Sequence, residues 1–536
     1  MRPLLILLLL VIFNSASTRA GKKVTADLSF ASHYGDHMVL QQAPKQAMVW
    51  GFAKTLGSVV KITVQNDSYS ATVQKNPQDN PGPGVWKVLL KPTPSSTPPV
   101  IISVKSVDGQ VAIKDVLFGD VWLCSGQSNM QFTTDMMLNA SEELEGASKY
   151  TQVRLFTASQ VTSDVPLLNL KSVEEVWSLA AKDTVGHQPW KYFSAVCWLY
   201  GRMLYDRLKY PVGLIDTTWG GTPVEAWSSP DALRQCYGHS NQDRVKVNDP
   251  LFPEAPGDHT VLWNAMIHPF LNTTIYGAIW YQGEANASPP TMNKYKCTFR
   301  AMIVDWRQKW HEGTMGQTDE NFPFGFVQLA PWRTKPNSPS GFSTIRWHQT
   351  YDMGYVPNYD LPKVFMAVAM DLPDPKSPWT GIHPRDKIDV AKRLVLSGLA
   401  VAYGKSGIKF QGPLPSAYFI DIGYYTLRVE YDSGKTPLEI RSSAGFELCC
   451  SHDNTSISQC NETSTLWHEV PLVSHDSTSV TMSYGKVAGC VGQWVMGMRY
   501  AWRETPCEFL ACPIYSVENG LPAPPYVTVG IIGYVV

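Results

Sequence analysis

The sequence predicts an α/β domain with a mostly parallel sheet, preceded and followed by all-β regions. Three observations indicate this arrangement. Short runs of alternating hydrophobicity, bounded by Gly and Pro, fill the chain up to about residue 112. Apolar strand-like runs then alternate with segments of helical periodicity up to about residue 410. Short β-type runs return after that point, together with six of the ten cysteines.

Residues 1–20 have the pattern of a secretory signal peptide. A charged start at Arg2 is followed by an apolar run from Leu4 to Phe13, and small residues precede Gly21. The run is shorter than the about 20 apolar residues that span a membrane as a helix. We therefore expect the mature protein in the secretory pathway, secreted or lysosomal, without stable membrane insertion.

The N-terminal β region is predicted over residues 24–112. It contains strand-like runs such as "AMVWGF" and "VVKITVQ", and the segments "KNPQDNPGPG" and "KPTPSSTPPV" are typical of loops. These features favour a small β-sandwich.

The α/β domain is predicted over residues 113–410. Its strands are expected in the runs "VLFGDVWLC", "VGLIDTTW", "IYGAIWYQ", "FGFVQLA" and "KVFMAVAMD". A helix is expected around Phe193 to Leu204, and another around Ile388 to Leu399, because apolar residues repeat there at helical spacing. In open parallel sheets, ligands bind beyond the carboxyl ends of the strands, so the loops after these strands are the candidates for chemistry.

The C-terminal β region, residues 411–536, contains the runs "YFIDIGYYTLRVEY" and "SVTMSYG" and is expected to resemble a second β-sandwich. Its six cysteines favour disulfides over zinc, since the chain has no C-x-x-C pair. The spacing does not select a pairing. Cys124 lies inside an apolar strand and is predicted to be a buried free thiol.

The composition excludes some functions and supports a secreted glycoprotein. The chain has 45 basic and 46 acidic side chains and no basic cluster, so we expect no nucleic-acid partner. No metal-ligand cluster is recognisable, and we expect neither a metal nor an organic cofactor. Six Asn-x-Ser/Thr sequons predict glycosylation at Asn66, Asn139, Asn272, Asn286, Asn454 and Asn461.

The turn "GQSNM" places Ser128 directly after the first predicted strand of the α/β domain. A serine in a strand-to-helix turn exposes its hydroxyl and leaves its own N–H free, as a nucleophile requires. The alternative is that Ser128 only caps the helix. The turn departs from the G-x-S-x-G pattern because Met130 replaces the second Gly, and this disfavours the α/β-hydrolase fold.

Three later loops carry further polar residues. The paired glycines of "WGGTPVEAW" can present an N–H to an anion, or can simply form a tight turn. The loop "YQGEANA" offers an amide at Gln282 and a carboxylate at Glu284. The loop "GIHPRDK" places His383 before a helix, where an imidazole could act as a base, although a lone histidine is more often structural.

The ordered set "GQSNM", "WGGTPVEAW", "YQGEANA" and "IHPRDK" resembles the sialate O-acetylesterase family, a branch of the SGNH-type esterases. The likeness extends from "DHMVLQQAP" to "ENGLPAPP" and covers nearly the whole mature chain. It implies an SGNH-type three-layer domain with a parallel sheet. It also implies Ser128 as the nucleophile and His383 as the base. The implied oxyanion donors are the N–H of Ser128, the N–H of Gly221 or its neighbour Gly220, and the amide of Gln282.

One departure from the family pattern concerns the acid that orients the histidine. The resemblance implies an aspartate just before His383, but Thr380 and Gly381 occupy those places. We rank Asp374 first as the replacement. Asp371, Glu284 or a backbone carbonyl are the alternatives, and the last would leave a Ser–His dyad.

The resemblance further implies removal of acetyl groups, notably the 9-O-acetyl group, from sialic acids through an acetyl-enzyme. The substrate carboxylate requires a cation, for which Arg385 is the first candidate, with Arg346 and Arg333 as alternatives. Glu284 and Trp219 are also expected to contact the substrate. The alternatives are an esterase for another acetylated glycan such as xylan, a secreted carbohydrate-binding protein without activity, and a thiol hydrolase that uses Cys124.

Overall fold

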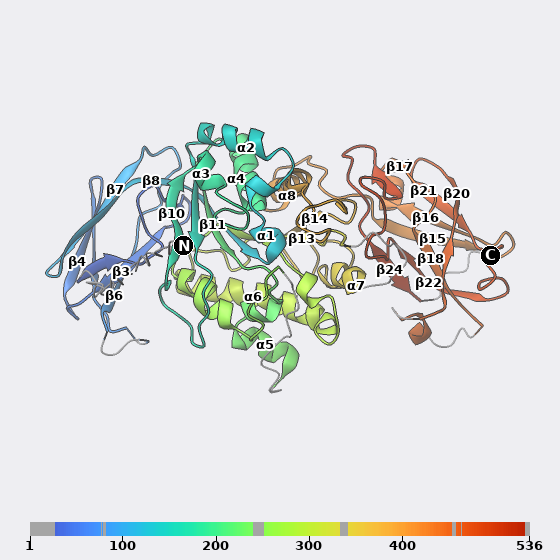
Figure 1. Ribbon diagram of the computed structural model, residues 1–536, viewed down its shortest axis with the longest axis horizontal. Helices are drawn as coiled ribbons and strands as arrows, with labels where there is room; N and C mark the ends of the chain where they lie inside the picture. Colours follow the sequence, from blue (N-terminus) through green and yellow to red (C-terminus); the bar gives the residue numbers. More distant parts are fainter. Residues whose placement is uncertain are drawn as a thin grey trace, which may run out of the picture.

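The computed structural model describes residues 27–76, 78, 82–238, 251–332, 341–452, 457–461 and 464–530. The expected signal peptide lies outside these residues. Figure 1 shows an elongated molecule in which strands and helices at the centre lie between a β region at each end. The predicted combination of an α/β region with β regions before and after it is confirmed.

The first eight strands form a separate three-stranded sheet and a set of strands that is continuous with the central sheet. They are β1 (Leu28–Phe30), β2 (Val39–Gln41), β3 (Met48–Ala53), β4 (Val59–Val64), β5 (Asp67–Thr72), β6 (Gly84–Leu89), β7 (Val100–Ser106) and β8 (Gly109–Gly126). Strand β8 has 18 residues: it pairs antiparallel with β7 near its start and parallel with β11 near its end. The N-terminal β region and the central sheet therefore share one continuous strand, which crosses the boundary predicted after residue 112.

The central sheet has the strand order β10-β9-β11-β8-β12-β13-β14. The further strands are β9 (Val153–Ala158), β10 (Val173–Leu179), β11 (Val212–Thr218), β12 (Gly277–Tyr281), β13 (Phe324–Gln328) and β14 (Val364–Val368). Each pairs in parallel with its neighbours except β10, which is antiparallel to β9. All five apolar runs predicted as strands are present, and β11 to β14 are buried at every position, as expected for a sheet covered on both faces.

Helices cover both faces of this sheet (Figure 1). They are α1 (Ser128–Gln131), α2 (Ala140–Gly146), α3 (Lys182–Val185), α4 (Ala195–Leu208), α5 (Pro230–Tyr237), α6 (Tyr295–Gly313), α7 (Gly341–His348) and α8 (Lys387–Val401). Tyr200 of α4 packs on Trp122 of β8, and Trp306 of α6 packs on Trp280 of β12 from the other side. The sequence predicted α4 and α8 but not α6, whose buried face includes Asp305 and Arg307 and therefore lacks a clear apolar period.

The C-terminal strands form small antiparallel sheets. They are β15 (Pro415–Asp421), β16 (Thr426–Tyr431), β17 (Leu438–Ile440), β18 (Phe446–Ser451), β19 (Trp467–Val470), β20 (Leu472–His475), β21 (Ser479–Ser483), β22 (Trp494–Tyr500), β23 (Ile514–Ser516) and β24 (Tyr526–Val529). Two four-stranded sheets have the orders β15-β16-β21-β20 and β19-β18-β22-β24, and β17 pairs with β23.

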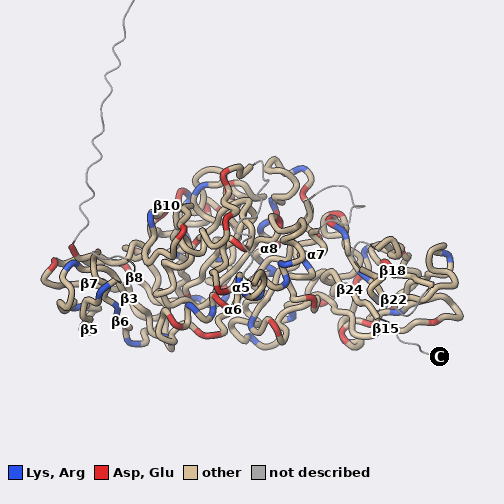
Figure 2. The backbone as a smooth tube through the Cα atoms, turned by 90° about the horizontal axis from the view of Figure 1, so that it is seen from below, with Lys and Arg blue, Asp and Glu red and all other residues tan. Residues whose placement is uncertain are grey.

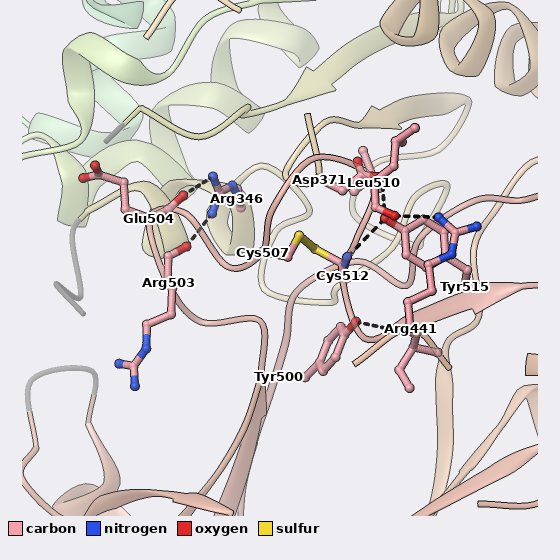
Figure 3. The surroundings of a disulfide bond; sticks show 12 residues. Arg346, Asp371, Arg441, Tyr500, Arg503, Glu504, Cys507, Leu510, Cys512 and Tyr515 are labelled. Carbon is pink, nitrogen blue, oxygen red and sulfur yellow. Dashed lines mark hydrogen bonds between the residues drawn. A yellow bond between two sulfur atoms is a disulfide. The ribbon is translucent and has the colours of Figure 1, made fainter. Parts of the chain in front are cut away.

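The C-terminal region is held to the central region by buried polar contacts (Figure 3). Arg346 of α7 is fully buried and donates to the main-chain oxygens of Arg503 and Glu504 at 2.7 and 2.8 Å. Asp371, which follows β14, accepts from the Tyr515 hydroxyl at 2.8 Å. These contacts stabilise the segments that follow β13 and β14.

Five disulfides join all ten cysteines: Cys124–Cys197, Cys236–Cys297, Cys449–Cys460, Cys450–Cys490 and Cys507–Cys512. The predicted disulfides among the late cysteines are confirmed. The prediction of a free thiol at Cys124 is wrong, because α4 crosses β8 where Cys197 faces it, a contact between segments 73 residues apart. This pairing also removes the thiolate that a Cys124 thiol hydrolase would need.

Neither hydropathy nor charge singles out one part of the molecule. No helix among the described residues is long and apolar enough to cross a membrane. Figure 2 shows basic and acidic residues mixed along the length of the chain.

Candidate active site

The turn after β8 presents Ser128 as the first residue of α1. Gly126 ends the strand with φ +139°, and a Cβ there would lie 2.3 Å from the Tyr281 carbonyl oxygen, so only glycine fits. The N-cap residue is Gln127, not Ser128, and no side chain caps the helix. The Ser128 hydroxyl is therefore not used for capping, although the residue is only 2% exposed.

The structure brings Ser128 and His383 together across 255 residues of chain. The His383 Nε2 atom lies 2.8 Å from the Ser128 Oγ atom. The other ring nitrogen, Nδ1, lies 2.6 Å from the main-chain oxygen of Trp379. Because a carbonyl oxygen only accepts, Nδ1 carries the hydrogen, and Nε2 has the lone pair that faces the serine hydroxyl.

Asp374 does not orient the imidazole, and this corrects the prediction from the sequence. Its carboxylate binds Arg385 through Nε at 2.6 Å and Nη2 at 3.0 Å. The Trp379 carbonyl takes the place of the acid, which agrees with the alternative of a backbone carbonyl and a Ser–His dyad. Thr380, which lies between Trp379 and His383 in the chain, has φ +69°, a strained value for a β-branched residue. The chain turns at this residue, and the Trp379 oxygen faces the ring.

Burial keeps the His383 imidazole neutral. The ring is fully buried, and burial lowers the pKa of His383 to about 4. The Trp379 carbonyl opposes this shift, while the positive charge of Lys387 adds to it. The histidine therefore remains unprotonated at pH values where a solvent-exposed imidazole would be charged.

Within the part of the chain that the structure describes, the backbone N–H groups of Ser128 and Gly221 have no hydrogen-bond acceptor. The neighbouring Gly220 N–H donates to Gln131 Oε1 at 2.7 Å, which distinguishes the two glycines. Gly221 has φ +73°, a conformation that glycine adopts without strain.

The Gln282 amide is fully used inside the protein, contrary to the expected oxyanion role. Its Nε2 donates to the Thr222 carbonyl at 3.1 Å and to Asn286 Oδ1 at 2.7 Å, and its Oε1 accepts from the Tyr295 hydroxyl at 3.0 Å. Rotating the amide by 180° would set its oxygen against the two acceptors, so this orientation is required. An amide with both hydrogens engaged has none left for an oxyanion.

Three amide side chains around Ser128 connect its turn to the other three loops. Gln127 Oε1 accepts from the Ala285 N–H at 3.1 Å, and Gln131 binds the Gly220 N–H. Asn129 Nδ2 donates to the main-chain oxygen of Ile382, the residue before His383, at 2.8 Å. These roles were not predicted from the sequence. The available signal was an amide side chain at every second residue of "GQSNMQ", where an apolar strand ends.

Aromatic rings cover the imidazole. The Trp190 ring lies edge-on to His383, with 5.1 Å between centroids, and Phe252 lies 5.0 Å from Trp190. Phe252 also covers Gly220, where a Cβ would lie 2.4 Å from its ring. Neither residue was predicted, because nothing in their sequence context distinguishes them from core aromatics. The predicted Trp219 is half-buried against the core.

The other predicted substrate residues have partners within the protein. Glu284 Oε1 accepts from Asn129 Nδ2 at 2.7 Å. Arg385 pairs with Asp374 but keeps its side chain 28% exposed. Arg346 is fully buried on main-chain oxygens and cannot meet a ligand, and Arg333 lies outside the described residues. No group of three or more His, Cys, Asp or Glu in the described ranges could hold a metal ion.

The sequons differ in exposure. Asn66, Asn139 and Asn461 are exposed, and Asn454 lies outside the described residues. Asn286 is fully buried and its Nδ2 donates to Glu225 Oε2 at 2.8 Å, which rules out a glycan in the folded protein and corrects the prediction. Asn272 is 7% exposed, and its Oδ1 accepts from Lys87 Nζ at 2.7 Å, a bond that does not involve the Nδ2 atom that carries a glycan, so glycosylation at Asn272 stays a prediction.

Comparisons with known proteins identify the class of protein to which the chain belongs. The family described as "Carbohydrate esterase, sialic acid-specific acetylesterase" matches residues 118–383, which include both Ser128 and His383. A structure of a carbohydrate acetylesterase from Xanthomonas citri is similar with a TM-score of 0.74 and 25% identity, covering 94% of this chain and 99% of that chain. The fold and the matched region define a carbohydrate esterase.

The sialate O-acetylesterase C-terminal domain matches residues 416–530. The human sialate O-acetylesterase is 41% identical over 501 residues, covering 93% of this chain and 92% of that protein. The rat sialate O-acetylesterase is 39% identical over 552 residues, covering 98% of each. This chain belongs to the sialate O-acetylesterase family.

Proposed function

We propose that the protein is a serine esterase that removes O-acetyl groups from sialic acids, with Ser128 as the nucleophile and His383 as the general base. The observation that carries the mechanism is the 2.8 Å contact between Ser128 Oγ and a His383 Nε2 whose ring is fixed by the Trp379 carbonyl. Family membership supports the substrate class. The catalysis uses a Ser–His dyad oriented by a main-chain oxygen.

The reaction has two steps. Ser128 Oγ gives its proton to His383 Nε2 and bonds to the acetyl carbon, and the carbonyl oxygen becomes an oxyanion. The N–H groups of Ser128 and Gly221 bind that oxyanion. The bond to the sugar oxygen then breaks, and this oxygen takes the proton from Nε2. In the second step, water gives a proton to Nε2 as its oxygen attacks the acetyl group, and Ser128 leaves with that proton, releasing acetate.

The ester is the 9-O-acetyl group on the glycerol side chain of sialic acid. Arg385 is the partner for the substrate carboxylate, because it is partly exposed and only two residues from His383. Trp190 and Phe252 provide apolar surface beside the base, on which the acetyl group or the sugar can pack. Glu284 and Trp219 are the further residues proposed to contact the substrate.

The central region is an SGNH-type three-layer esterase domain, over residues 113–410. The N-terminal β domain over residues 24–112 continues into it through β8. Residues 411–536 form the C-terminal domain. Five disulfides and exposed sequons at Asn66, Asn139 and Asn461 suit a secreted or lysosomal glycoprotein.

The test compares acetate release from 9-O-acetylated sialic acid by the wild type, Ser128→Ala and His383→Ala, with folding checked by circular dichroism. We expect each substitution to lower kcat by about 10⁴-fold or more. Labelling with a fluorophosphonate should occur at Ser128 in the wild type only. Full activity of Ser128→Ala would overturn the mechanism, and a preference for acetylated xylan would overturn the substrate. Absence of both labelling and acetate release would indicate a carbohydrate-binding protein.

A further inference from the structure

Lys387 is a buried lysine beside the Ser128–His383 pair to which the mechanism above assigns no role. It is the first residue of α8 and is fully buried. Its Nζ atom lies 2.7 Å from Asn129 Oδ1, and 4.6 and 5.3 Å from the ring centroids of Phe132 and Tyr281. The ion pairs found among the described residues include none formed by Lys387.

This location is unfavourable for the stability of the protein. Removing an ammonium group from water is unfavourable unless a carboxylate pairs with it. A positive charge in the first turn of a helix also opposes the helix dipole. The cation–π contacts with Phe132 and Tyr281 offset only part of this cost. Burial lowers the pKa of Lys387 to about 7, so the side chain carries its charge in acid. A role in function explains this buried lysine better than a role in folding.

Asn129 connects Lys387 to the segments that carry Ser128 and His383. Asn129 directly follows Ser128, and its Nδ2 donates to the oxygen of Ile382, the residue before His383. Its second Nδ2 hydrogen goes to Glu284 Oε1. Because an ammonium group only donates, its position on Oδ1 requires the amide oxygen to face Lys387 and the amide hydrogens to face the two acceptors.

We propose that Lys387 is a positioning residue for the Ser128–His383 pair, acting through Asn129. The proposal rests on the proposed serine mechanism. The ammonium group locks the Asn129 amide, and that amide joins the turn carrying the nucleophile to the loop carrying the base. Small displacements of reacting groups have large kinetic effects, since a shift of about 1 Å can cost about 10²-fold in rate.

The charge of Lys387 has a second effect, on His383. It lowers the pKa of the imidazole, in addition to the larger effect of burial. The charged groups around the site are Glu284 on the 3₁₀ turn Glu284–Asn286, Asp386 at the N-cap of α8, and the Asp374–Arg385 pair. Removing the ammonium would take a positive charge away from the imidazole, and this change favours protonation of His383.

The experiment uses the full chain with Lys387→Met, which keeps the unbranched side chain up to about the position of Cε and removes the charge. Its matched control is Lys392→Met on the same helix, where the lysine is 61% exposed and pairs with Asp389. We expect Lys387→Met to lower kcat about 10- to 100-fold with little change in KM, to move the acid limb of kcat/KM to higher pH, and to leave the thermal midpoint within a few degrees. The control should match the wild type.

A second variant, Asn129→Ala, tests the route of the effect. It should lose activity to a similar extent, and the double variant should lose no more than the worse single variant, because one contact is removed twice. The rate of fluorophosphonate labelling is also measured for the wild type and each variant, because it reports the reactivity of Ser128 directly.

The outcomes separate the two proposals. If the wild type labels at Ser128 but Lys387→Met has the same labelling rate and the same pH profile, the role of Lys387 is wrong and the mechanism stands. If activity falls only in proportion to lost folded protein, Lys387 is structural. If the wild type does not label at Ser128, the serine mechanism itself fails.

Discussion

The buried His383 predicts an esterase that stays active in acid. The general base must be neutral, and burial lowers the pKa of His383 to about 4, compared with about 6.5 for a free imidazole. At pH 5 about nine-tenths of such a group is neutral, whereas at a pKa of 6.5 only about 3% would be. The rate at pH 5 is therefore expected to be about 30-fold higher than with an unperturbed histidine.

The assay is kcat/KM for acetate release between pH 3.5 and 7, because this ratio reports the ionisation of the free enzyme. The expected profile is nearly flat from pH 7 to 5 and loses half its value near pH 4. Tryptophan fluorescence at each pH controls for unfolding, which would mimic an acid limb. A half-point near pH 6.5 in protein that is still folded would refute a base held neutral by burial.

Three further predictions follow from particular contacts. Asp374→Asn should keep kcat within about tenfold of the wild type, because a carbonyl orients the imidazole, whereas loss of a triad aspartate costs about 10⁴-fold. Replacing Cys124 and Cys197 together by Ala should lower the free energy of unfolding by about 2–5 kcal/mol, measured in guanidinium chloride, since the bond closes a loop of 73 residues. Mass spectrometry of protein expressed through the secretory pathway should find the Asn286 peptide without a glycan and a glycan at Asn66, because Asn66 is exposed whereas Asn286 is buried.

Each of these has a contrary result. A 10⁴-fold loss in Asp374→Asn would restore the aspartate as the orienting acid. Reaction of the native protein with a thiol reagent at Cys124 would show that its disulfide is absent. A glycan on Asn286 would mean that this buried loop has a different structure.

The sequence alone determined the strands of the central sheet and indicated Ser128 and His383 as the proposed reacting pair. The runs ending near Cys124 and Tyr281 are long, apolar and bounded by polar loops, so their period and their ends can be recognised locally. Ser128 and His383 stand in short motifs at such ends, where a parallel sheet places its ligands. These signals depend only on neighbours in the chain.

Tertiary structure decided how each polar group is used. The orienting group of His383 is a main-chain oxygen, which every residue has and no sequence motif marks. Its sequence context makes Gln282 a candidate oxyanion donor, but in the folded chain the Thr222 carbonyl and Asn286 Oδ1 accept both of its amide hydrogens. Hydrogen-bond capacity is finite and is assigned among groups brought together from distant segments. A sequence lists the donors and acceptors, but only the folded chain determines which of them meet.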